Sequence, residues 1–167
     1  MGLYFLDTSA LVKYYVSEPG TRWVVELLDA RTADNQQFLH YIFITTTTLT
    51  EVSTALSILW RRKLITRRHL EGGYARFLSD VDKRLFLLHL SVTDFYFAGK
   101  LAQKHPLKAY DAIQLAAALR YNEALVSHGF FTYLCKWRQN ITDCRQGRRF
   151  ADGQPFRSSL PRRSFQK

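Results

Sequence analysis

Three carboxylates in this 167-residue chain occupy positions from which they could share one cation. Asp7 directly follows a short apolar run, Glu51 lies one turn into a helical pattern, and Asp111 lies in the first turn of another. Carboxylates that gather repel one another unless a cation lies between them. Ligation by oxygen alone, without His or Cys, favours Mg²⁺ or Mn²⁺. Such an ion activates water and orients a phosphate, so the predicted chemistry is phosphodiester hydrolysis.

Each of these acids also has a purely structural interpretation. Asp7 could cap the helix that follows it. Glu51 completes a capping-box pattern that begins at Thr48. Asp111, in the first turn of a helix, complements the helix dipole. Taken singly, each residue favours the structural interpretation, so the catalytic one depends on the three acids converging and on the sequence around them.

The elements that would position these acids alternate between short apolar runs and helical patterns. Strands are predicted at residues 3–6, 39–45, 85–90 and 124–127. Helices are predicted at residues 10–16, 48–62, 92–105 and 110–121, with two more beginning near Pro19 and at Thr66. This order predicts an α/β fold with a central parallel sheet of four to five strands and helices on both faces. Ligand sites in such sheets lie outside the carboxyl ends of the strands, where the three acids would meet.

Composition sets the class of protein and of partner. Hydrophobic residues make up 47% of the chain, which excludes wholesale disorder. A net charge of +10 favours a polyanion such as nucleic acid as partner. Two cysteines, Cys135 and Cys144, fit a reducing compartment. With neither a signal-like start nor a membrane-spanning run, the sequence predicts a soluble, cytoplasmic protein with no membrane partner.

The chain changes character after Ser127. Residues 128–167 carry nine basic side chains against two acids, whereas residues 1–127 carry 15 against 12. No helical or strand period persists there. We therefore predict one domain at 1–127 and an atypical basic tail at 128–167. A shift of the reading frame near codon 128 would explain the tail, and a genuine RNA-binding tail is the alternative. Resequencing the locus tests the first hypothesis, which an intact gene whose relatives share this tail would refute.

Three segments carry a family resemblance. The first reads YFLDTSALVKYY from Tyr4 and ends in Glu18-Pro19-Gly20, the second reads LTEV from Leu49, and the third reads AYDAIQLAAA from Ala109. Together they resemble the acidic motifs of PIN-domain ribonucleases of the VapC toxin type, over residues 3–127. The resemblance implies a PIN fold, Mg²⁺-dependent cleavage of RNA, homodimerisation and inhibition by a cognate antitoxin.

The sequence departs from this family at its fourth acid. Relatives usually read Ser/Thr-x-Asp after the last core strand. With a strand at 124–127, Gly129 falls about where that Asp would be. The departure favours an alternative, a catalytically lapsed PIN-like domain that binds antitoxin or RNA without cleaving. A third interpretation is a basic nucleic-acid-binding protein whose acids are only caps.

Further residues are candidates for supporting roles. Thr8 and Ser9 could hold a metal's water or a phosphate oxygen, although capping explains them equally well. Asp94 is interpreted as a helix-start residue and a reserve candidate for the site. A basic run near one helix junction could follow an RNA backbone or form an ordinary solvated surface; it comprises Arg61, Arg62, Arg67 and Arg68.

Overall fold

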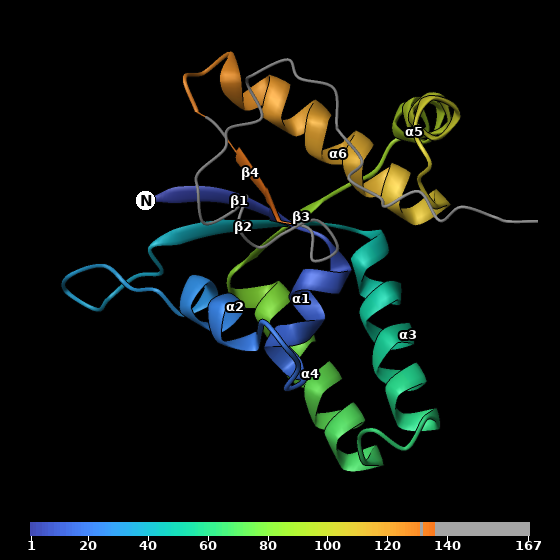
Figure 1. The fold of residues 1–167 in the computed structure, drawn as a ribbon. Coiled ribbons are helices and arrows are strands. Elements are labelled where there is room, and N and C mark those ends of the chain that lie inside the picture. The colour runs from blue at the N-terminus through green and yellow to red at the C-terminus, as the bar shows by residue number, and fades with distance from the viewer. Residues whose placement is uncertain (131, 136–167) are drawn as a thin grey trace, which may run out of the picture.

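A four-stranded parallel sheet lies between two layers of helices (Figure 1) in the computed structural model, which describes residues 1–130 and 132–135. The strands are β1 (Gly2–Leu6), β2 (His40–Thr45), β3 (Leu85–Leu88) and β4 (Thr132–Cys135), in the order β3-β2-β1-β4. All three strand pairs are parallel. The predicted α/β architecture is confirmed.

Six helices are found among the described residues, and they divide between the two faces of the sheet. One face carries α1 (Thr8–Tyr15), α2 (Thr21–Leu28), α3 (Thr47–Arg61) and α4 (Arg67–Lys83). The other carries α5 (Val92–Lys104) and α6 (Ala109–Val126) (Figure 1). No helix in this part of the chain is long and apolar enough to cross a membrane.

Neighbouring side chains along β1, β2 and β3 point to opposite faces of the sheet and therefore belong to two separate hydrophobic cores. Leu6 and Ile44 face α1–α4, whereas Phe5 and Leu88 face α6. This pattern follows from the strand period of two, which sends neighbouring side chains to opposite faces. Because both faces are covered by helices, the strands read as continuous apolar runs rather than as alternating ones.

The strand predicted at residues 124–127 is wrong. These residues belong to the end of α6 and the turn after it, because α6 continues to Val126. A short apolar run does not by itself distinguish a strand from a buried helical turn, and here the helix continues. The fourth strand is β4, eight residues further along, and it pairs with β1 through backbone hydrogen bonds.

This correction changes the comparison made at Gly129. Gly129 has a φ of 80° and lies in the turn between α6 and β4, before the last strand and not after it. The three residues that follow β4 read Lys136-Trp137-Arg138 and contain no carboxylate, and they lie outside the described residues, as does Cys144. The domain boundary at 127 and the frameshift hypothesis remain predictions.

The helix predicted to begin near Pro19 begins later. Gly20, with a φ of 94°, is the N-cap of α2, and the helix starts at Thr21. Glu18 and Pro19 therefore lie in the connection between α1 and α2. This connection matters for the site because Glu18 faces the cavity described below.

Candidate active site

Asp7 lies at the junction of β1 and α1. It is the N-cap of α1, and its carboxylate accepts hydrogen bonds from the Ala10 backbone N–H at 2.8 Å and from the Ser9 hydroxyl at 2.8 and 2.9 Å. The capping interpretation is therefore correct, yet the same residue also lines a cavity. The two roles coexist because a carboxylate has more acceptor positions than the cap uses.

Glu51 does not form the predicted capping box. Thr46 is the N-cap of α3, so Thr48 already lies inside the helix, without a capping hydrogen bond. The Glu51 carboxylate instead accepts hydrogen bonds from the Thr8 hydroxyl at 2.7 Å and from the Gln114 amide at 2.6 Å. One side chain thus connects α3 with α1 and with α6.

Asp111 lies in the first turn of α6, as predicted, and Gln114 follows three residues later on the same side of the helix. Gln114 is 4% exposed, and its Nε2 donates to Glu51, to Thr8 at 3.2 Å and to Thr48 at 3.4 Å. Its Oε1 is buried and has no hydrogen-bond partner among the described residues. Sequence reasoning missed Gln114, although its spacing from Asp111 was a usable signal.

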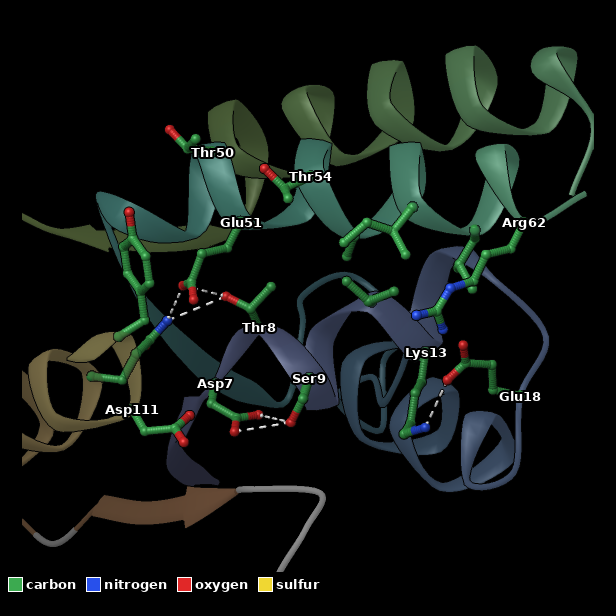
Figure 2. Close-up of a pocket in the computed structure, with 16 residues that line it drawn as sticks. Asp7, Thr8, Ser9, Lys13, Glu18, Thr50, Glu51, Thr54, Arg62 and Asp111 are labelled. Carbon is green, nitrogen blue, oxygen red and sulfur yellow. Dashed lines mark hydrogen bonds and ion pairs between the residues drawn. The ribbon is translucent and has the colours of Figure 1, made fainter. Parts of the chain in front are cut away.

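These side chains surround a cavity of about 710 Å³ at the carboxyl end of β1 (Figure 2). The three predicted acids line one end of this cavity, whereas Lys13, Glu18 and Arg62 line the other end (Figure 2). The remaining lining residues come from α1, α3 and α6: Thr8, Ser9, Val12, Thr50, Thr54, Ala55, Ile58, Leu59, Tyr110 and Gln114.

The donors at the acidic end fit a hard divalent cation. They are carboxylates and hydroxyls, with no His or thiol, which is the ligand chemistry of Mg²⁺ and Mn²⁺. No three acidic, His or Cys side chains of the described chain lie close enough together to form a ready-made metal site. Mg²⁺ usually retains several waters and is held by only one or two carboxylates, so looser spacing is compatible with it.

The other predicted site residues fall into two groups, those that line the cavity and those that do not. Thr8, Ser9 and Arg62 line the cavity, whereas Arg61, Arg67 and Arg68 do not. Arg67 forms an exposed ion pair with Glu71.

Asp94 is a structural residue of α5. It completes a capping box with Ser91 and pairs with Arg120 of α6 at 2.5 Å, away from the cavity. The helix-start interpretation of Asp94 is therefore correct.

Comparison with known proteins identifies the family. The PIN domain profile matches residues 4–129, most of the chain. The chain belongs to the PIN domain family. The resemblance based on the three acidic motifs is thereby confirmed, and the PIN match includes all three acids of the cavity. No curated protein matches the sequence.

Two solved structures are among those similar to this chain. VapC20 of Mycobacterium tuberculosis, described as a sarcin–ricin loop-cleaving toxin, has a TM-score of 0.53 and 16% identity, over 86% of this chain and 95% of that one. VapBC2 of Rickettsia felis, bound to a DNA fragment from its promoter, has a TM-score of 0.48 and 17% identity, over 79% of this chain and 98% of that one. At 16% identity, the likeness to VapC20 shows that the PIN fold is shared.

Proposed function

We propose that this PIN domain is a metal-dependent endoribonuclease of the toxin type, acting on RNA in the cytoplasm. One observation carries the proposal. Asp7, Glu51 and Asp111 come from three distant segments of the chain and line one cavity. A hydrogen-bonded chain of Thr8, Glu51 and Gln114 links two of these segments to the helix that carries the third acid.

Each residue has a proposed role. Asp7 and Asp111 would hold Mg²⁺, or Mn²⁺, and Glu51 would hold it directly or through water. When bound, such a cation supplies an activated water and neutralises charge that develops on the phosphate. Thr8 keeps the Glu51 carboxylate turned toward the cavity, and Ser9 holds that of Asp7. Both carboxylates are thus oriented before any substrate arrives, which lowers the cost of assembling the site.

The test is cleavage of RNA with Mg²⁺ by the full chain and by Asp7→Asn and Asp111→Asn. Each substitution preserves shape but removes a charge that a hard cation needs, so cleavage should fall at least about 100-fold. Asp82→Asn, at an exposed position of α4 outside the cavity, is the matched control and should cleave normally. Cleavage that persists in Asp111→Asn, or with EDTA in place of Mg²⁺, would refute the proposal.

A second candidate function is a lapsed domain that binds RNA or an antitoxin without cleaving. It is favoured by the wide spacing of the acids and by the absence of a carboxylate in the three residues after β4. In that case the purified chain binds RNA, no metal supports cleavage, and the two Asn substitutions change nothing. A cognate antitoxin and a second copy of the chain are proposed partners under either function, on the strength of the sequence motifs.

A further inference from the structure

The end of the cavity opposite the acids is lined by two basic side chains and one acidic one, those of Lys13, Arg62 and Glu18. Lys13 of α1 is buried, with a side chain 4% exposed, and its Nζ lies 2.9 Å from the Glu18 carboxylate. Burying a lysine without a partner is costly, and the Glu18 carboxylate offsets part of that cost. The two formal charges cancel.

Backbone contacts fix the segment that carries Glu18. Its N–H donates to the Thr21 hydroxyl at 2.9 Å, and that hydroxyl donates to the Lys13 carbonyl at 2.9 Å. The pair therefore joins α1 to the connection between α1 and α2. These two side chains form an ion pair with no net formal charge in the wall of the cavity.

Arg62 adds a positive charge at the same end of the cavity. It is the C-cap of α3, and its side chain is exposed and extends toward Glu18 and Lys13 (Figure 2). Among the described residues, its guanidinium forms no ion pair or hydrogen bond, whereas the guanidinium groups of Arg67, Arg84 and Arg120 each pair with a carboxylate. The basic end of the cavity therefore carries one net positive charge, at a planar group suited to binding phosphate through two hydrogen bonds.

We propose that this basic end is a subsite for one phosphodiester group of the RNA strand, next to the phosphate that is cut. This inference rests on the proposed function. Arg62 contacts the phosphate, and the Lys13–Glu18 pair determines the net charge of the cavity wall beside it. The same cavity contains the half-exposed ring of Tyr110, on which a base can stack, so its chemistry suits a single-stranded nucleotide chain.

Binding to a short fluorescent single-stranded RNA tests the subsite. Anisotropy would be measured without divalent ions, in the Asp111→Asn background, over a series of salt concentrations. Arg62→Ala should weaken binding about fivefold and lower the slope of log K against log salt by about 0.7, the value for one phosphate contact to a single strand. Arg61→Ala, a neighbouring arginine outside the cavity, is the matched control and should change binding less than twofold.

Glu18→Gln should change the affinity for RNA in the opposite direction. It removes a negative charge from the wall of the cavity, so RNA should bind at least about twofold more tightly. A role for Glu18 in stability alone would not produce this gain. Because the variant could fail to fold, its thermal melting is recorded first, and the two arginine variants decide the question if it has unfolded.

The outcomes separate the subsite from the proposed nuclease. Equal losses in Arg61→Ala and Arg62→Ala, or no loss in either, would refute the subsite. If the wild-type chain cleaves no RNA while Arg62→Ala still weakens binding selectively, the nuclease proposal fails and the phosphate subsite stands. In an active enzyme, Arg62→Ala should raise KM about fivefold and leave kcat nearly unchanged, because it removes binding common to the substrate and the transition state.

Discussion

The two helical layers of this protein differ in how they attach to the sheet. Counted over the described residues, the core on the α1–α4 side contains fourteen buried hydrophobic side chains, including Phe77, Leu56 and Ile44. On the α5–α6 side there are two small groups, of four and three, and five of these seven residues are alanines. Alanine buries little area, so the second layer gains less from the hydrophobic effect.

The candidate site joins the two layers. Asp7 and Glu51 come from elements next to the large core, whereas Asp111 and Gln114 come from α6, in the smaller layer. The three acids therefore line one cavity only when α6 docks correctly. Polar contacts from Gln114 supply part of the positioning that the alanine-rich packing cannot provide.

The largest expected difference between the layers is in the free energy of unfolding. Leu56→Ala, fully buried in the large core, should destabilise by about 3–4 kcal/mol, because surrounding side chains cannot fill the cavity it leaves. Leu88→Ala, in the small group beneath α6, should cost about 2 kcal/mol, because a thinner layer can relax around it. Urea denaturation measures both. Equal costs would show that the two layers pack equally well.

A smaller effect is expected at the ion pair between α5 and α6. Burial would raise the pKa of Asp94, but hydrogen bonds from Ser91 and the charge of Arg120 outweigh it and hold that pKa below its ordinary value. Because the pKa is lowered in the folded state, the stabilisation is present above about pH 4 and is lost as the pH falls through the folded pKa. Asp94→Asn should cost about 2 kcal/mol at pH 7.

Stability curves for wild type and Asp94→Asn between pH 7 and pH 3 measure this contribution. The difference between the two proteins should shrink as the pH falls below about 4. A difference that stays constant over this range would contradict the stabilising role assigned to the Asp94 carboxylate.

The smallest effect concerns Gln114 itself. Gln114→Leu keeps the size of the side chain and removes both the donor to Glu51 and the buried, unpartnered Oε1, so stability should change by less than about 1 kcal/mol. Mn²⁺ affinity, measured by calorimetry, should fall about tenfold, since groups that orient a ligand commonly contribute that much. An unchanged affinity would mean that Thr8 alone orients Glu51.

Much of the fold was predictable from local pattern. The apolar runs of β1, β2 and β3 are continuous and flanked by polar residues, and the helical periods around Leu56 and Phe77 are clear. The placing of Asp7 and Glu51 at one cavity followed from where β1 and β2 end, whereas Asp111 comes from α6, which follows α5 and not a strand. These features are local, or follow from general rules of α/β topology.

The features that could not be predicted depend on tertiary contacts. Residues 124–126 satisfy a strand pattern as well as a helical one, and only the continuation of α6 decides between them. Glu51 satisfies a capping-box pattern, but hydrogen bonds from Thr8 and Gln114, 43 and 63 residues away in sequence, determine where its carboxylate lies. No local pattern carries that information.

The position of β4 has a consequence for synthesis of the chain. β1 is a central strand, but one of its two neighbours is the last strand described, so its outer edge stays open until residue 135 has been made. The first three strands are complete at Leu88, and the ribosome needs a few more seconds to add the intervening residues. During that interval the nascent chain exposes an apolar strand edge that can pair with other chains. Chaperone dependence and aggregation during translation should therefore respond to changes near β4 more strongly than the equilibrium stability does.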